Sequence, residues 1–283
     1  MIVFEQPDQF RRYLDEARAA GKRVGFHPTM GALHGGHLCN IHQVSAECDV
    51  AAVSIYANPL QFGPGEDYEA YPRDLHGDLA KSEEAGADVV FVPPTMFAGE
   101  PMVTVHVKRL SEILEGSHRP GHFDGVATIV TKLLCIAGPC SAYFGEKDYQ
   151  QLLLVRRLVE DLSLPVAVVQ CPVVREPDGL ALSSRNAYLS AVERAAAPVL
   201  YWSLLAGKRA VEEEGVTDAK LVRSAMVEVA AREPLVKLEY AAVTAPGDLK
   251  DLEVVGREAR LLVAGRLGGT RLIDNVEATT GED

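Results

Sequence analysis

The chain has few aromatic residues and few cysteines for its length. Among 283 residues, aromatic side chains make up 6% and there is a single tryptophan. The five cysteines are scattered and include no C-x-x-C pair; they are Cys39, Cys48, Cys135, Cys140 and Cys171. An odd, dispersed set argues against a disulfide framework or a zinc site and favours small, buried, reduced thiols.

Long apolar runs and a signal-peptide pattern are also missing. No uninterrupted apolar stretch reaches the ~18 residues that a membrane span needs. The first residues, from Met1 to Pro7, show no basic start followed by an apolar core. We therefore expect a cytoplasmic protein with no membrane partner.

Basic residues are outnumbered by acidic ones. The chain carries 28 Lys and Arg against 40 Asp and Glu, a formal net charge of −12. General binding to nucleic acid needs a cationic face, so nucleic acid is not an expected partner, although a local basic pocket stays compatible with this balance. Hydrophobic content of 47% and charged content of 24% are typical of a globular protein.

From the first residue to about residue 174, short apolar runs alternate with helical segments. Strands are predicted at residues 24–27, 50–57, 87–92, 141–144 and 166–174. Helices are predicted at residues 8–21, 36–48, 74–85, 123–137 and 148–162, with Asp8 as the N-cap of the first. Continuously apolar strands separated by helices predict an α/β, Rossmann-like, doubly wound parallel sheet in a domain of residues 1–174. Ligands of such sheets bind at the carboxyl ends of the strands.

The pattern changes near Arg175 to a smaller α+β domain of residues 175–283. Its predicted helices span residues 191–213 and 218–233, and its predicted strands span residues 238–243, 259–263 and 270–273. Glu176-Pro177-Asp178-Gly179, between the two domains, is a turn signal and a natural hinge.

The segment PTMGALHGGH, residues 28–37, follows the first core strand and opens a helix. Its glycines allow a close backbone approach to a ligand, and the helix start offers unpaired N–H groups and a positive dipole end. His34 and His37 are three residues apart and share one face of a helical turn. This arrangement suits a polyphosphate. Two other interpretations stay open: one histidine caps the helix while the other packs in the core, or the pair binds a metal, although no third ligand is close in sequence.

Two further segments combine a cation with a helix start. In GEKDYQQ, residues 145–151, Lys147 opposes the helix dipole, so a bound anion would explain its position; the alternative is a solvated loop lysine. In LSSRN, residues 182–186, two hydroxyls precede Arg185, which can hold a phosphate with two parallel hydrogen bonds; the alternative is a capping serine turn.

Two segments carry polar side chains without a cation at a helix start. NPLQF, residues 58–62, follows the second core strand, where side-chain amides can orient a small polar substrate. RPGHFDG, residues 119–125, is a turn that opens a helix, and its His122 is as compatible with a structural role as with a functional one. We expect these five segments to follow successive strands of one sheet, which would bring them to a single rim, so together they predict a site for ATP and a small acid.

Taken together and in order, these segments resemble the pantothenate synthetase family, ATP-dependent ligases that join pantoate to β-alanine. The resemblance extends over nearly the whole chain and includes YPR at residues 71–73, DGLALSSRN at residues 178–186 and RLIDN at residues 271–275. The H-x-G-H and S-S-R elements are also similar to the two signature motifs of the wider nucleotidyltransferase and class I aminoacyl-tRNA synthetase superfamily.

The resemblance implies roles for individual residues. His37, as a general acid toward the phosphates, would act with His34, Lys147 and Arg185 in catalysis. Residues implied to bind ATP are Met30, Gly31, Ala32, Leu33, His34, Gly35, Gly36, His37, Gly145, Glu146, Lys147, Asp148, Val174, Leu182, Ser183, Ser184 and Arg185. Gln61 and Gln151 would bind pantoate, with Gln61 near β-alanine too. A family Mg²⁺ would bridge the ATP phosphates near Asp78, and the resemblance implies a homodimer.

Several positions depart from the usual pattern of that family. His27 stands where an apolar residue is common, and Gly77 where an acid is frequent, which weakens the case for a protein-held metal. Asp124 and Cys140 are also unusual, and residues 93–101 are shorter than the family's flexible lid. None of these departures removes a residue that the resemblance assigns to ATP or pantoate.

The expected activity is therefore an AMP-forming condensation of pantoate with β-alanine through pantoyl adenylate. Two alternatives are a nucleotidyltransferase that stops at an activated product and a nucleotide sensor without catalysis. A tRNA-charging role is disfavoured by the net charge of −12 and by the lack of an anticodon-binding extension.

Overall fold

The computed structural model describes residues 1–281, and the chain divides into two compact units. The first unit contains residues 1–146 and 150–172; the second contains residues 147–149 and begins again at Val173. The predicted boundary between residues 174 and 175 lies two residues after this second start. The short segment 147–149, which the sequence places in the first domain, groups with the second unit.

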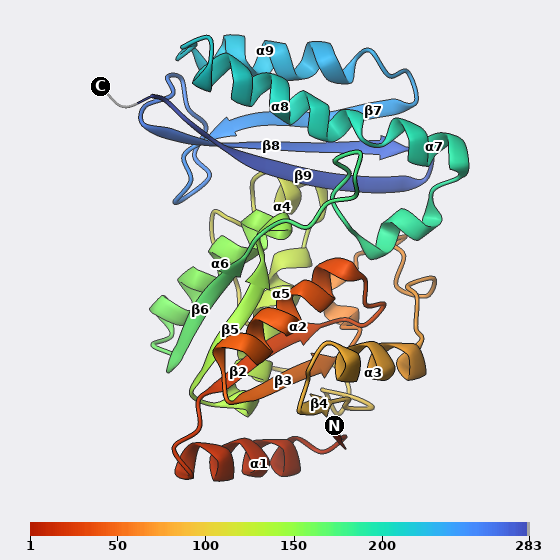
Figure 1. Cartoon of the computed structure of the whole chain (residues 1–283), viewed down its shortest axis with the longest axis vertical. Helices are drawn as coiled ribbons and strands as arrows, with labels where there is room; N and C mark the ends of the chain where they lie inside the picture. The colour runs from red at the N-terminus through yellow and green to blue at the C-terminus, as the bar shows by residue number, and fades with distance from the viewer. Residues whose placement is uncertain (282–283) are drawn as a thin grey trace. The chain divides into compact units, whose positions relative to one another are not determined.

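Within the described residues, the first unit is built on one six-stranded parallel sheet in the order β1-β4-β3-β2-β5-β6 (Figure 1). Its strands are β1 (Ile2–Phe4), β2 (Val24–Thr29), β3 (Val50–Ile55), β4 (Val89–Phe91), β5 (Cys140–Gly145) and β6 (Val166–Cys171). Its helices are α1 (Pro7–Ala19), α2 (Gly35–Glu47), α3 (Leu75–Glu84), α4 (Glu115–His118), α5 (His122–Ala137) and α6 (Tyr149–Asp161), with 3-10 turns η1 (Pro59–Gln61) and η2 (Glu146–Asp148).

Alternation along β2 shows how both faces of this sheet are covered. Phe26 packs against Phe10 of α1 on one face. Gly25 and His27 face α2 on the other: a Cβ on Gly25 would lie 2.5 Å from Val44, and the ring of His27 lies 6.0 Å from that of His37. Because successive strand residues point to opposite faces, the sheet is buried on both sides. The predicted doubly wound, Rossmann-like architecture is confirmed, with the helix starts of α2 and α6 following β2 and β5.

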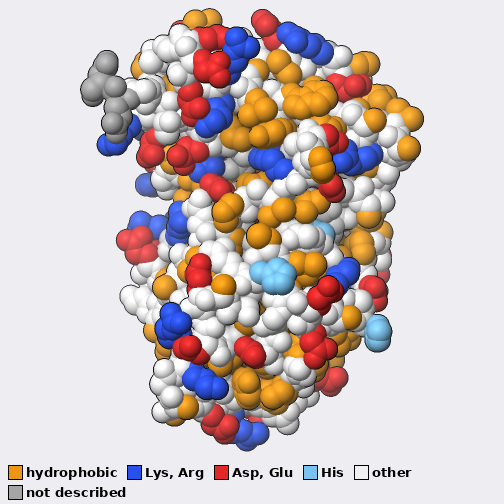
Figure 2. All heavy atoms as spheres, in the orientation of Figure 1, with side chains coloured by type: hydrophobic (Ala, Val, Ile, Leu, Met, Phe, Trp, Pro, Cys, Tyr) orange, Lys and Arg blue, Asp and Glu red, His pale blue; other side chains and the backbone are white. Residues whose placement is uncertain are grey.

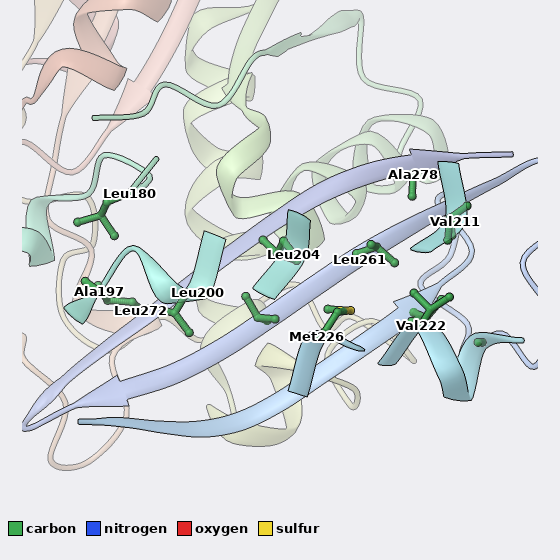
Figure 3. Packing of buried hydrophobic residues seen from close by; sticks show 14 of the residues in the cluster. Leu180, Ala197, Leu200, Leu204, Val211, Val222, Met226, Leu261, Leu272 and Ala278 are labelled. Carbon is green, nitrogen blue, oxygen red and sulfur yellow. The ribbon is translucent and has the colours of Figure 1, made fainter. Parts of the chain in front are cut away.

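The second unit contains, among its described residues, a three-stranded antiparallel sheet of β7 (Val236–Thr244), β8 (Glu258–Leu267) and β9 (Thr270–Thr279). Helices α7 (Ala191–Ala196), α8 (Val199–Glu212) and α9 (Ala219–Ala230) follow the turn η3 (Ser184–Tyr188). Figure 3 shows its core, where Leu200 and Leu204 of α8 and Met226 of α9 pack over Leu261 of β8. The predicted smaller α+β region is confirmed.

Several local features differ from the sequence predictions. The five cysteines were expected to be buried, but Cys39 and Cys135 are exposed, Cys48 and Cys140 are partly buried, and Cys171 is buried. The single helix predicted at residues 191–213 is interrupted at Pro198, which has no N–H to donate to an intrahelical bond. The first helix begins at Pro7 with Gln6 as N-cap, so Asp8 lies in the first turn instead of capping it. Strand β1 was missed because three residues are too short for a periodic signal; it pairs with β4, far away in sequence.

Charge on the face seen in Figure 2 is mixed, with acidic and basic side chains interspersed among the residues that are coloured. Among residues 1–281, no helix is both long enough and apolar enough to cross a membrane.

Candidate active site

The loop that follows β2 is held in a strained conformation by Asp78 of α3. Gly31 and Ala32 both have positive φ angles, 83° and 51°. Asp78 is buried, and its two carboxylate oxygens accept hydrogen bonds from the backbone N–H groups of Ala32 (2.8 Å) and Leu33 (2.7 Å). Left-handed backbone at a non-glycine residue costs roughly 1–2 kcal/mol, and a hydrogen bond to a charged group contributes about 1.5–3 kcal/mol. The carboxylate therefore offsets the strain and fixes the entry to α2.

Glycine is required at position 31 for a second reason. A Cβ there would lie 2.9 Å from Asp78 Oδ2, on the carboxylate that holds the loop. Lys81, one turn further along α3, donates to the carbonyl of Leu33 at 2.9 Å. Two side chains of one helix thus fix the backbone of residues 31–33.

His34 and His37 cap the start of α2 reciprocally. His34 is the N-cap, and its Nδ1 accepts a hydrogen bond from the backbone N–H of Gly36 at 3.1 Å. The backbone N–H of His34 in turn donates to Nδ1 of His37 at 3.4 Å, and the two rings lie 4.1 Å apart. Because each Nδ1 is an acceptor, the proton of each neutral imidazole lies on Nε2. Of the alternatives left open by the sequence, helix capping is therefore realised, and both rings also present an N–H donor.

His27 is a third histidine of this region, and it is fully enclosed. Its Nδ1 lies 2.8 Å from the carbonyl oxygen of Tyr143 and donates to it, while Nε2 is buried without a hydrogen-bond partner among the described residues. Burial lowers the pKa of His27 to about 4, with the hydrogen bond to Tyr143 opposing that effect. The ring is therefore neutral at physiological pH.

Gln61, predicted to bind pantoate, is in contact with the loop predicted to bind ATP. Its Nε2 lies 2.9 Å from Sδ of Met30, and its Oε1 accepts a hydrogen bond from Nδ2 of Asn58 at 3.1 Å. The structure thus brings together the motifs of residues 28–37 and 58–62, which are separate in sequence. Asn58, the other amide of the NPLQF segment, is buried and also donates to the carbonyl of Gly125 at 3.1 Å, so its side chain is used within the fold.

The backbone of Gln61 is fixed by the RPGHF segment. Nδ1 of His122 donates to the carbonyl oxygen of Gln61 at 2.8 Å, and Arg119 Nη2 lies 3.4 Å from the same oxygen. Arg119 is held by both carboxylate oxygens of Glu66, each at 2.7 Å. Burial, together with the nearby positive charge of Arg119, lowers the pKa of His122 to about 4, although the hydrogen bond to Gln61 opposes this shift. His122 is therefore a neutral positioning group, which resolves the ambiguity that the sequence left.

A glycine allows α5 to approach this turn. A Cβ at position 125 would lie 2.1 Å from the carbonyl oxygen of Leu60. The unusual Asp124 beside it binds the segment before α4: its carboxylate accepts from the backbone N–H of Val107 at 2.9 Å and lies 2.8 Å from Nδ1 of His106. This departure from the family pattern therefore has a structural role.

Gln150 is buried and was not among the predicted site residues, which include its neighbour Gln151. Its side-chain oxygen accepts from the backbone N–H of Glu115 at 3.1 Å, and its nitrogen donates to the carbonyl oxygens of Leu110 (2.6 Å) and Ile113 (2.9 Å). These bonds hold the segment around α4. Gln151 is partly buried, and no side-chain hydrogen bond joins it to the described residues, so its amide is compatible with the predicted contact to a substrate.

The remaining predicted ATP residues lie on two segments of the second unit, apart from Gly145 and Glu146 of the first. Val174 and Leu182 face each other in a small hairpin, where the Leu182 N–H donates to the Val174 carbonyl at 3.0 Å. Its tip is the predicted turn at residues 176–179, where Gly179 has a φ of +97°. Ser183 caps η3 by accepting from the Arg185 N–H at 3.3 Å, so the capping-serine interpretation holds for this residue.

Lys147 lies in η2 at the junction between β5 and α6. Its Nζ lies 3.5 Å from Oδ1 of Asp148, a long ion pair, and its carbonyl oxygen accepts from Nδ2 of Asn275 at 2.9 Å. Within residues 1–281, no group of three or more His, Cys, Asp or Glu side chains is arranged to hold a metal ion. Both carboxylate oxygens of Asp78 accept backbone N–H groups, so this residue anchors the loop after β2.

Comparison with known proteins agrees with these features. Residues 2–277 match the family model described as pantoate-beta-alanine ligase. The pantothenate synthetase of Chloroflexus aurantiacus is 51% identical over 280 residues, covering 97% of each chain.

Two solved structures extend this comparison. The pantothenate synthetase of Thermus thermophilus superposes with a TM-score of 0.92 at 46% identity, covering 98% of this chain and 99% of the other. The pantoate-beta-alanine ligase of Francisella tularensis, solved with beta-gamma ATP and beta-alanine, gives a TM-score of 0.79 at 34% identity, covering 98% and 97%. Because residues 2–277 match the family model and a relative covering 97% of the chain is 51% identical, the chain belongs to the pantoate–β-alanine ligase family.

Proposed function

We propose that this ligase condenses pantoate with β-alanine in two steps. The pantoate carboxylate attacks the α-phosphorus of ATP, forming pantoyl adenylate and releasing pyrophosphate. The neutral amine of β-alanine then attacks the acyl carbon, the C–N bond forms, AMP leaves, and the amine loses a proton. Family membership supports the substrates and the product, pantothenate, while the reciprocal cap of His34 and His37 is the observation that carries the mechanism.

In this scheme the histidines stabilise the charge that develops on the phosphates. Because their Nδ1 atoms accept backbone hydrogen bonds, both rings offer Nε2–H to a phosphate oxygen at the start of α2. The resemblance assigns His37 the role of general acid toward the departing pyrophosphate; proton transfer would need the protonated ring, so the neutral tautomer would act by donating its Nε2–H hydrogen bond. Such preorganised donors need no reorientation during the reaction, which is why they lower the barrier. Residues Met30 to Gly36 would line the ATP site beside them.

Gln61 and Gln151 would bind pantoate, with Gln61 also near β-alanine. The contact of Gln61 with Met30 supports this assignment, because the side-chain amide of Gln61 lies beside the loop assigned to ATP. Arg119 and His122 contact the carbonyl oxygen of Gln61, so they would help to set the direction of this amide. Accurate positioning of this kind contributes strongly to reactions between two bound reactants.

The second unit would supply cations for the phosphates through Lys147 and Arg185, with Ser183 and Ser184 as hydroxyl donors. Val174 and Leu182, paired across their hairpin, would contact the nucleotide, and Gly145, Glu146 and Asp148 would complete the ATP contacts. Shielding the acyl adenylate from water is the further role that we propose for this unit.

Mg²⁺ enters this scheme with ATP, as part of the substrate. The donor set does not fit a resident ion: both oxygens of Asp78 accept backbone N–H groups, and no metal-binding cluster occurs in the described part of the chain. No step is therefore assigned to a protein-held metal. The proximity of Asp78 to Mg²⁺ rests on the family resemblance alone.

Product analysis tests the proposal directly. Purified protein with ATP and pantoate should release pyrophosphate, and addition of β-alanine should yield pantothenate and AMP in equal amounts. Release of ADP would contradict adenylate chemistry. A product yield indifferent to the amine would instead identify a nucleotidyltransferase, and binding of ATP without pyrophosphate release would identify a sensor.

We propose a homodimer on the same resemblance, and a cytoplasmic location on the odd, dispersed set of cysteines. Sedimentation of the purified chain would give twice the monomer mass if the dimer forms, and the monomer mass if it does not.

A further inference from the structure

Two adjacent buried polar residues of β9 are not used by the chemistry proposed above. Asp274 and Asn275, in the RLIDN segment, are 5% and 2% exposed. Because side chains alternate along a strand, they point to opposite faces of the three-stranded sheet. Each must therefore satisfy its hydrogen bonds with a different set of partners.

Asn275 connects the sheet to Lys147. Its Oδ1 accepts from Arg260 Nη1 at 3.0 Å, and its Nδ2 donates to the carbonyl oxygen of Lys147 at 2.9 Å. The arginine can only donate and the carbonyl can only accept, so this amide has one orientation that satisfies both. The side chain is a bridge of fixed polarity.

Arg260 in turn holds the residues next to Lys147. Its guanidinium lies 3.9 Å from the ring centroid of Tyr149, and its Nη2 lies 3.1 Å from Glu277 Oε2. The Tyr149 hydroxyl donates to the carbonyl oxygen of Pro246 at 3.0 Å. The three-residue segment 147–149 is thus fastened at its first residue by Asn275 and at its last by Arg260 and Pro246.

Asp274 fastens the other nucleotide segment of the same unit. It binds Arg175 through both oxygens, at 2.6 and 2.9 Å, and Arg175 also donates to the Asn275 carbonyl at 3.2 Å. The Arg175 guanidinium lies 4.0 Å from the Tyr201 ring centroid. One dipeptide therefore anchors both the Lys147 segment and the hairpin that begins beside Val174.

We propose that Asn275, supported by Arg260, is a positioning residue that sets where the ammonium of Lys147 lies during adenylate formation. It touches no reacting atom and acts through the Lys147 backbone. The inference rests on the proposed role of Lys147 at the phosphates. A shift of a charged group by about 1 Å is enough to lower turnover strongly, which makes such a bridge important for rate as well as for folding.

A double-mutant cycle tests this inference. Asn275→Asp keeps the acceptor for Arg260 but replaces the N–H donor with an oxygen that repels the Lys147 carbonyl. Measured as kcat of pantoate-dependent pyrophosphate release, Asn275→Asp should slow the enzyme at least about tenfold. In a Lys147→Ala background the same change should alter kcat by less than about twofold, because no ammonium remains to be misplaced.

A control variant and a replacement variant accompany the double-mutant cycle. Glu277→Gln perturbs the other partner of Arg260 and should leave kcat within about twofold. Should Asn275→Asp fail to fold by its thermal unfolding curve, Asn275→Ser, which removes the whole amide without adding a charge, replaces it in the cycle.

The outcomes distinguish the positioning role of Asn275 from the role of Lys147 itself. Equal rate losses from the Asn275 change in both backgrounds would overturn the positioning role while leaving Lys147 in place. A Lys147→Ala enzyme with unchanged kcat would instead overturn the proposed function of Lys147, and the positioning role with it.

Discussion

His37 accepts a hydrogen bond from the backbone N–H of His34 while the His34 ring caps the same helix. This relationship fixes the tautomer of both rings, since an Nδ1 that accepts leaves the proton on Nε2. The three-residue spacing of His34 and His37 therefore fixes the orientation of both rings, with the Nε2–H of each as the donor.

Replacing His37 by Ala should lower kcat by at least ~10²-fold, the usual scale for removing one charge-stabilising donor. The physical reason is the loss of Nε2–H, together with the bond that orients His34. Steady-state kinetics with saturating substrates would measure it. His42→Ala, on an exposed position of the same helix, is the control and should retain turnover. Wild-type kcat in the His37 variant would contradict the assigned role.

Lys147→Ala should also cost at least ~10²-fold in kcat. Its thermal unfolding should change little, because the Lys147 carbonyl that Asn275 binds is retained. Lys220→Ala, at an exposed position, is the matched loss of one cation. Equal turnover in the two variants would remove Lys147 from the mechanism.

Asp78→Asn should lower the free energy of unfolding by about 2 kcal/mol, because an amide cannot accept from both Ala32 and Leu33. Chemical denaturation in EDTA and in excess Mg²⁺ should give the same loss, since the carboxylate holds backbone. Exposed Glu84→Gln on the same helix serves as control. If stability were unchanged in EDTA while the Mg²⁺ requirement of the rate rose, Asp78 would be a metal neighbour instead of a loop anchor.

Arg119→Lys should raise KM for pantoate about tenfold, with KM for ATP within about twofold, because lysine cannot reproduce the paired bonds to Glu66 and the contact with the Gln61 carbonyl. Initial-rate measurements with each substrate varied would show it. Arg157→Lys, an exposed arginine of α6, is the control. Parallel increases in both KM values would indicate a general loss of structure.

Acid should destabilise the fold partly through His27. Its pKa is lowered from 6.5 to about 4 in the folded state, so between these values the unfolded chain binds more protons and stability falls as pH falls. This residue alone should account for about 2 kcal/mol lost between pH 7 and pH 5. Denaturation of His27→Leu should show a pH dependence smaller by that amount. The same dependence as in the unsubstituted chain would exclude this role, and His122, another buried histidine whose pKa is lowered to about 4, would be tested next.

Local sequence patterns predicted much of the secondary structure, because strands and helices depend on the residues within a few positions of one another. The continuously apolar runs that became β2, β3 and β5 predicted a buried parallel sheet, and the glycines and histidines after β2 predicted a helix start with donors. Pro198 shows the limit of periodicity: the apolar spacing continues through it, but the missing N–H divides the helix.

The sequence by itself determined the alternation of strands and helices, the positions of the glycine-bearing corners and the ordered motifs that resemble one ligase family. Only the tertiary structure decided the partners: Asp78 with Ala32, Gln61 with Met30, and Asn275 with Lys147 are 46, 31 and 128 residues apart. Helix and strand periodicities extend over a few neighbours, whereas buried polar atoms must find partners wherever the folded chain brings them. For that reason these three pairs could be seen only after the chain had folded.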